Sequence, residues 1–94
     1  MAYEVRYSDV AIEQLRKLRA FDRTAILDQI EQVLGVNPTL ESKARVKQPR
    51  QPAPTQFRLR VGDFRVFYDV EPTVVYVIQV LSKDDSVAYL EGSS

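Results

Sequence analysis

One hairpin signal constrains the fold of this chain more than any other feature: the segment FRLRVGDFRVFYD at residues 57–69. Apolar residues alternate with other residues on both sides of Gly62-Asp63, and such a pair between two alternating runs is typical of a two-residue β-turn. The turn fixes the pairing register of the two strands, so each strand presents one apolar face to a core. In this register three arginines share the opposite face: Arg58, Arg60 and Arg65.

The first 40 residues predict a strand followed by two helices. Residues 2–7 alternate in the manner of a half-buried strand, and Ser8-Asp9 offers an N-cap for a first amphipathic helix. Asp22 can cap a second helix, whose apolar residues recur at helical spacing up to Gly35. We expect these two helices to form a hairpin.

A proline-rich stretch separates the helices from the rest of the chain. Residues 37–56 hold four of the five prolines and little periodicity, which predicts an extended loop. Three strands are expected after it, at about 56–61, 64–70 and 74–81. A polar tail with a few apolar anchors follows. The predicted order is βααβββ, an α+β fold in which a helical hairpin packs on a mostly antiparallel sheet, and residues 1–94 form a single domain.

Composition excludes several kinds of chemistry. The chain has no cysteine and no histidine, so disulfides, thiolate nucleophiles and histidine-based triads are absent. Any acid–base chemistry must therefore use a carboxylate, a lysine or a tyrosine. Hydrophobic residues make up 45% of the chain, but they form neither a membrane-spanning run nor a secretory signal. A cytoplasmic location is expected.

The net charge of zero conceals a basic middle segment. Residues 41–65 carry seven Lys or Arg against two carboxylates, a local charge of +5. Like charges opposite one another on a sheet are destabilising, so folding alone gains nothing from Arg60 facing Arg65. A solvated sheet face is the simpler explanation, and a surface for RNA phosphates is the alternative. The residues expected to bind RNA are Lys43, Arg45, Lys47, Arg50 and, by base stacking, Phe67.

Three patterns in the second half of the chain belong together: the string RLRVGDFRVFYDV, the apolar strand VVYVIQVL, and a lysine six residues before a tyrosine in SKDDSVAYL. They resemble the RelE/ParE superfamily of toxins from bacterial toxin–antitoxin pairs. For the RelE branch, the resemblance implies an endoribonuclease without metal or other cofactor. Such a toxin cuts messenger RNA in the ribosome by making the ribose 2′-hydroxyl attack the adjacent phosphate. The implied partners are the ribosome, messenger RNA and a cognate antitoxin.

The same resemblance implies a catalytic role for five residues. Arg60 and Arg65 match sheet positions that hold the phosphate and stabilise the charge that develops on it. Arg58 takes a basic position that helps to activate the nucleophile. Lys83 and Tyr89 take the places of a C-terminal arginine and tyrosine. Positive charge around them is expected to make either one a better base.

Four positions depart from the family pattern. Lysine at position 83 gives up the bidentate phosphate binding of arginine, and Asp84-Asp85 places negative charge where RNA is expected. Gln56 stands where some members carry another lysine. An adjacent carboxylate pair is most often solvated, so no metal site is expected at Asp84-Asp85.

Two alternatives to the endoribonuclease stay open. A ParE-type toxin shares the fold and poisons DNA gyrase, and a catalytically silent relative only binds its antitoxin. The Lys83-to-Tyr89 spacing and the clustered arginines favour the ribonuclease branch. In each case, an acidic and amphipathic segment of an antitoxin would suit the basic loop and the sheet edge.

Overall fold

The computed structural model describes residues 3–39, 45–47 and 55–91, and it describes residues 45–47 by their backbone alone. Its elements follow one another as β1 (Glu4–Tyr7), α1 (Asp9–Arg16), α2 (Ala20–Gln29), η1 (Ile30–Leu34), β2 (Arg45–Lys47), β3 (Phe57–Val61), β4 (Phe64–Val70), β5 (Val74–Ser82) and α3 (Lys83–Glu91). Within the described part of the chain, no helix is both long and apolar enough to cross a membrane.

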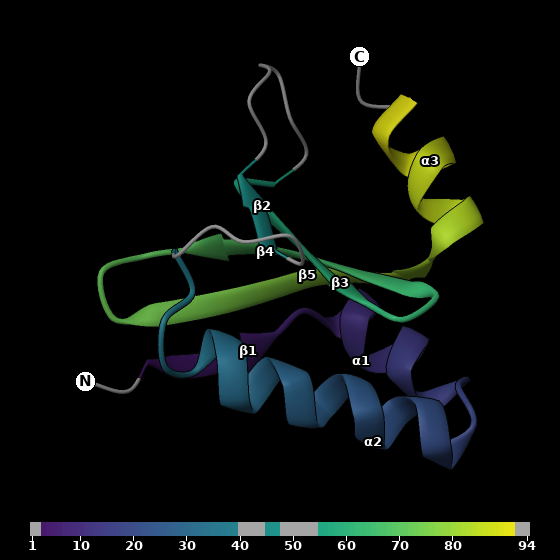
Figure 1. Cartoon of the computed structure of the whole chain (residues 1–94), viewed down its shortest axis with the longest axis horizontal. Coiled ribbons are helices and arrows are strands. Elements are labelled where there is room, and N and C mark those ends of the chain that lie inside the picture. Colours follow the sequence, from purple (N-terminus) through teal and green to yellow (C-terminus); the bar gives the residue numbers. More distant parts are fainter. Residues whose placement is uncertain (1–2, 40–44, 48–54, 92–94) are drawn as a thin grey trace.

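The strands form one sheet in the order β1-β5-β4-β3-β2. β1 runs parallel to β5, and the other neighbouring strands are antiparallel. α1 and α2 lie along one face of this sheet, while α3 leaves the end of β5 on the other side (Figure 1). The arrangement confirms the predicted α+β fold, in which a helical hairpin packs on a mostly antiparallel sheet.

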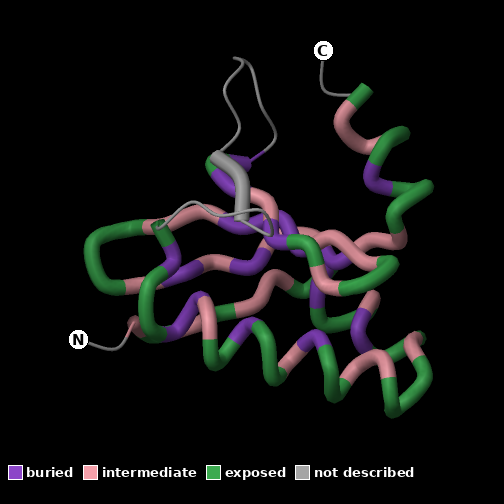
Figure 2. The backbone as a smooth tube through the Cα atoms, viewed as in Figure 1, coloured by how far each residue is buried: buried purple, intermediate pink, exposed green. Residues whose placement is uncertain are grey.

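The core lies between the helical hairpin and the sheet (Figure 2). It contains Ala11, Leu15, Ile26, Ile30 and Leu34 from the helices, and Phe57, Leu59, Val66, Tyr68, Val75, Val77 and Val80 from the strands. Tyr68 stacks on Phe57 with the ring centroids 5.3 Å apart, and its hydroxyl donates to the Pro38 carbonyl at 2.7 Å. Alternate residues of β3 and β4 are therefore committed to the core, which leaves the residues between them for the opposite face.

The start of α1 continues the edge of the sheet where β1 ends. The Ser8 backbone N–H donates to the Val77 carbonyl at 2.9 Å, and the Ser8 hydroxyl donates to the Ile78 carbonyl at 2.7 Å. The same hydroxyl caps α1 by accepting the Ala11 N–H at 3.0 Å, as predicted. One turn later, the Gln14 side chain accepts the Val80 N–H at 2.6 Å. These bonds satisfy backbone groups of β5 that no neighbouring strand reaches.

The second helix differs from the prediction at its start. It begins at Ala20 after Arg19, so Asp22 lies in the first turn and is not the cap. At the other end it continues as the wider π-helical turn η1 and ends at Gly35, as predicted. A Cβ at position 35 would lie 2.5 Å from the Glu31 carbonyl oxygen, so only glycine fits this helix end.

Two short elements were not predicted. β2 lies inside the stretch that was expected to be an extended loop, and it pairs with β3 over three residues. The expected polar tail is largely the helix α3, which follows β5 without a connecting loop. The predicted bounds of the three long strands agree with the structure to within one residue.

Candidate nucleic-acid interface

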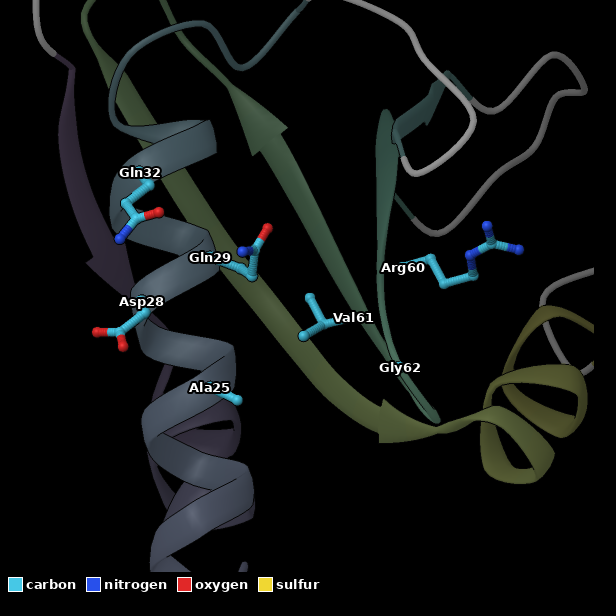
Figure 3. A pocket seen from close by; sticks show the side chains of 7 residues that line it. All are labelled: Ala25, Asp28, Gln29, Gln32, Arg60, Val61 and Gly62. Atoms are coloured by element: carbon cyan, nitrogen blue, oxygen red, sulfur yellow. The ribbon is translucent and has the colours of Figure 1, made fainter.

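The β3–β4 hairpin has the register that its sequence predicts. Arg60 pairs with Arg65, and Arg58 pairs with Phe67. The turn requires Gly62, whose φ of +55° lies in the left-handed region. In Figure 3, Val61 points toward α2 whereas Arg60 points away from it. The prediction that the arginines lie on the face opposite the helical hairpin is confirmed; we call Arg58, Arg60 and Arg65 the arginine face.

The charges of Arg58 and Arg60 lie close enough to act on Arg65. Partial burial, followed by the charges of Arg58 and Arg60, lowers the pKa of Arg65, while Asp63 opposes the shift. Arg65 Nη1 donates to the Gly62 carbonyl at 3.0 Å and to the Phe64 carbonyl at 2.9 Å, which fixes the group beside the turn. The Arg65 guanidinium has further N–H groups that can donate to a ligand.

No carboxylate of the described residues neutralises the arginine face through an ion pair. The ion pairs within residues 3–39 and 55–91 join Arg6 to Glu4 and Arg16 to Glu13, both away from the hairpin. Three like charges without a paired carboxylate raise the free energy of the fold slightly, and an anionic ligand would reverse that cost.

α3 begins beside the hairpin turn. The Lys83 N–H donates to the Asp63 carbonyl at 2.8 Å, so the first residue of α3 is tied to the turn that precedes Arg65. The Asp85 N–H donates to Ser82 Oγ at 3.1 Å. Asp84 and Asp85 therefore occupy the first turn of a helix, where the helix dipole stabilises negative charge. This position gives the acidic pair a structural role that the sequence did not suggest.

The Tyr89 ring packs against the Phe67 ring. Their ring centroids are 5.0 Å apart at an interplanar angle of 63°, an edge-to-face contact. Phe67 lies on the arginine face by register, as predicted, but its exposed fraction is 0%. The prediction that Phe67 stacks on a base is wrong for this conformation, because the unpredicted helix α3 brings Tyr89 over the ring.

The electrostatic setting of Tyr89 is also opposite to the prediction. Partial burial, followed by the negative charge of Asp69, raises the pKa of the Tyr89 hydroxyl. The expected lowering by the arginines is not found. A phenol in this environment keeps its proton at neutral pH, so it is suited to donate a hydrogen bond or a proton.

A contact between Gln56 and Asp69, which the sequence did not predict, lies at one end of the arginine face. The Gln56 N–H donates to Asp69 Oδ1 at 2.7 Å, and Gln56 Oε1 accepts the Val70 N–H at 2.9 Å. Gln56 is thus engaged in a strand-to-strand clamp rather than replacing a phosphate-binding lysine. The signal was present in the register: the pairing of Phe57 with Tyr68 places position 56 opposite position 69.

The predicted basic loop is only partly described. Lys43 and Arg50 lie outside the described residues. Arg45 and Lys47 are the two ends of β2, at register positions opposite Leu59 and Phe57, while Val46 is the residue paired with Arg58.

A groove of about 500 Å³ runs between α2 and the end of β3 (Figure 3). Its lining residues are Ala25, Asp28, Gln29, Gln32, Arg60, Val61 and Gly62. The Arg60 guanidinium points away from α2, so Arg60 borders the groove while its charge lies on the arginine face. Among the described residues, no group of three acidic side chains is placed to hold a metal ion.

The model of one protein family, the ParE toxin of type II toxin–antitoxin systems, matches residues 5–87. The chain belongs to this family. The family lies within the RelE/ParE superfamily, so the resemblance drawn from the hairpin and the Lys83-to-Tyr89 spacing is confirmed. No curated protein sequence matches the chain.

Solved structures of RelE toxins have the same fold. In the Mycobacterium tuberculosis toxin–antitoxin complex RelBE2, the match is 25% identical with a TM-score of 0.75, over 87% of this chain and 99% of that chain. The free E. coli toxin RelE, carrying two arginine-to-alanine substitutions, is 28% identical with a TM-score of 0.72, over 95% and 92% of the two chains. The RelE–RelB complex of Pyrococcus horikoshii, at 21% identity and a TM-score of 0.71, covers 88% of this chain and 97% of its own.

Proposed function

We propose that this toxin is an endoribonuclease that cleaves messenger RNA on the ribosome without a metal ion, and that it acts in the cytoplasm. The observation that carries the proposal is the arginine face with α3 beside it. Arg65 is held next to the turn, Lys83 starts α3 at the same turn, and Tyr89 lies over the adjacent residue Phe67. Cationic residues and one phenol thus lie on or beside the same face of the sheet.

Cleavage by attack of the ribose 2′-oxygen requires few groups beyond these. When the ribose 2′-oxygen attacks the neighbouring phosphorus, negative charge accumulates on the phosphate oxygens. Arg60 and Arg65 would bind those oxygens, and Arg58 would increase the acidity of the 2′-hydroxyl through its charge. The ribosome would hold the RNA in line for attack, which accounts for an open surface in place of a deep pocket.

The direct test combines the purified chain with translating ribosomes and a defined message. We expect cleavage of the ribosome-bound message, little cleavage of the same RNA free in solution, and a 2′,3′-cyclic phosphate on the upstream fragment. A different terminus would contradict attack by the 2′-hydroxyl. Equal cleavage of free RNA would contradict the dependence on the ribosome.

Substitutions of Lys83 test whether cleavage depends on a cationic group at this position. Lys83→Arg is expected to hold or raise the cleavage rate, because a guanidinium can bind two phosphate oxygens at once. Lys83→Ala is expected to lower the rate. The matched control is Lys17→Arg at the C-cap of α1, an exposed lysine away from the arginine face, which should leave the rate unchanged. A large loss in Lys83→Arg would show that position 83 needs an amine rather than a cation in general.

The matching family model supports a second candidate, a toxin that poisons DNA gyrase. The arginine face would then contact gyrase or DNA. A supercoiling reaction with gyrase separates the two functions, since a gyrase poison traps cleaved DNA and leaves ribosome-bound messages intact. If neither reaction occurs, the chain is a silent relative that only binds an antitoxin.

We also propose that the partner of this chain is an antitoxin encoded beside it. Two of the similar structures are complexes of a RelE toxin with its antitoxin, which supports the proposal. The uncompensated arginine face favours an antitoxin segment that carries carboxylates. Co-expression with the neighbouring small gene should yield a stable complex, and cleavage or gyrase poisoning should stop in that complex.

A further inference from the structure

Two glutamines meet at the edge of the sheet where α1 lies beside β5. Gln14 Oε1 accepts the Val80 N–H at 2.6 Å, and Gln14 Nε2 donates to Gln79 Oε1 at 2.6 Å. A backbone N–H can only donate, so the Gln14 atom that it contacts must be the amide oxygen. The other end of the Gln14 amide is then a donor, and the Gln79 atom that faces it must be an oxygen. The backbone of β5 therefore fixes the polarity of both amides.

The Gln79 side chain lies on the same face of the sheet as the arginines. Gln79 pairs with Phe67, and the next pair on this face joins Leu81 to Arg65, whereas Val80 between them belongs to the core. Gln79 and Arg65 are thus diagonal neighbours, which lie about 7 Å apart in antiparallel strands. Because Gln79 is partly exposed and its Oε1 is engaged by Gln14, the group that it presents to a ligand is Nε2.

The N–H groups of Gln79 Nε2 have no protein acceptor among the described residues. A guanidinium is the stronger partner for a phosphate oxygen, so a neutral amide beside the arginines is better matched to an uncharged acceptor. Rotating the Gln79 amide by 180° would set its Nε2 against Gln14 Nε2, donor against donor. Gln79 can therefore donate to a ligand but cannot accept from one. Guanine and uracil carry a carbonyl oxygen where adenine and cytosine carry an amino group, so a fixed donor distinguishes the two classes.

We propose that Gln79 selects the base of the bound RNA: when a phosphate lies on the arginine face, Gln79 Nε2 donates to the base of that nucleotide and favours guanine or uracil over adenine or cytosine. Gln14 is the positioning residue that sets the direction of this preference. The inference rests on the proposed ribonuclease function and deepens it, because the arginines alone would bind the phosphate of any nucleotide.

Nucleotide binding tests this selection without a ribosome. The four nucleoside 5′-monophosphates are titrated into the parent chain, and NMR shifts of the β4 and β5 backbone amides give each dissociation constant. GMP is compared with AMP and UMP with CMP, so ring size is matched within each pair. We expect GMP and UMP to bind about fivefold more tightly than their partners, the scale of one net hydrogen bond. Gln79→Leu keeps a side chain of similar size without the donors and should bring each pair to equal affinity. Equal affinities in the parent chain, or no binding of any nucleotide, would overturn the proposal.

Gln14→Glu is the decisive variant, because it changes no atom that contacts the nucleotide. A glutamate at position 14 still accepts the Val80 N–H, but its second oxygen can only accept as well. The Gln79 amide should then rotate, donate to this oxygen and present Oε1 to the ligand, so AMP and CMP should bind more tightly than GMP and UMP. The added charge lowers the affinity for all four nucleotides, so the ratio within each pair is the readout.

Gln32→Glu is the matched control for Gln14→Glu. It makes the same substitution at an exposed position of η1, on the helical side of the sheet, and should keep the preference of the parent chain. A preference for GMP and UMP that persists in a folded Gln14→Glu chain would overturn the proposal.

Cleavage assays separate this inference from the proposed function. If the chain cleaves ribosome-bound messages but binds the nucleotides of each pair equally, the ribonuclease proposal is supported and the role of Gln79 is overturned. If the preference is present and reverses in Gln14→Glu while no message is cleaved, the ribonuclease proposal falls and base selection by Gln79 is supported without it.

Discussion

Arg65→Ala is expected to slow cleavage of ribosome-bound messenger RNA by about 10²-fold or more, the scale seen when a preorganised donor to a developing oxyanion is lost. The bonds from Arg65 to the Gly62 and Phe64 carbonyls fix its guanidinium before substrate arrives, so little reorganisation is needed in the transition state. Single-turnover rates at saturating ribosomes would measure the loss.

Arg65→Lys and Arg16→Ala are the matched comparisons for Arg65→Ala. The lysine keeps the charge without the planar fork, so its rate should fall between those of the parent chain and Arg65→Ala. Arg16, on α1, has 74% of its side chain exposed and pairs only with Glu13 among the described residues, so its loss should not affect cleavage. A folded Arg65→Ala chain with a rate within about threefold of the parent would remove Arg65 from the catalytic set.

Tyr68→Ala is expected to lower the free energy of unfolding by about 3–5 kcal/mol, the range for large-to-small changes of aromatic residues in a core. Tyr68 is completely buried, stacks on Phe57, and through its hydroxyl ties the chain after η1 to the sheet. A domain of this size has a total stability of about 5–15 kcal/mol, so the variant would be marginally folded at best.

Urea unfolding would measure the effect of Tyr68→Ala, and Tyr68→Phe is its control. The phenylalanine keeps the ring contacts and leaves the Pro38 carbonyl without this donor, which should cost about 1–3 kcal/mol. If both variants lost the same stability, the hydroxyl would carry the whole contribution and the ring packing would contribute nothing measurable.

The hairpin and its arginines could be predicted because their determinants are local. A turn that needs glycine at a positive φ fixes the register, and the register alone decides which side chains share a face. The two N-terminal helices were equally accessible, because their apolar residues recur at helical spacing. The start of α2 was placed too late because Asp22 is a good cap by type, yet Arg19 occupies that position without a side-chain cap bond.

α3 could not be read from periodicity, because it is short and its apolar residues do not form a single stripe. Val87 is about half exposed, and Ser86 is the residue of α3 that is buried. Its signals were the serine cap at position 82 and two acidic residues in the first turn, which at first suggested a solvated loop. Missing α3 had a direct consequence for the site: the burial of Phe67 depends on the helix that carries Tyr89.

The environment of Tyr89 depends on contacts between residues far apart in the sequence. Asp69 could be assigned by its type as a counter-charge for the arginines, but only the folded sheet shows that Gln56 holds it beside Tyr89. A sequence places charges along a strand, whereas the sign of a pKa shift depends on which charge is nearest in space and on how deeply the group is buried.

The attachment of α3 makes the number of residues between Lys83 and Tyr89 a determinant of function within this family. Because Lys83 is fixed to the hairpin turn, the six residues to Tyr89 advance the helix by about 9 Å and determine where the phenol lies above the sheet. One inserted residue between them would rotate Tyr89 by about 100° around the helix axis and remove it from Phe67, although every functional side chain would still be present. Two family members with the same arginines, lysine and tyrosine can therefore differ in activity through the number of residues that separate them.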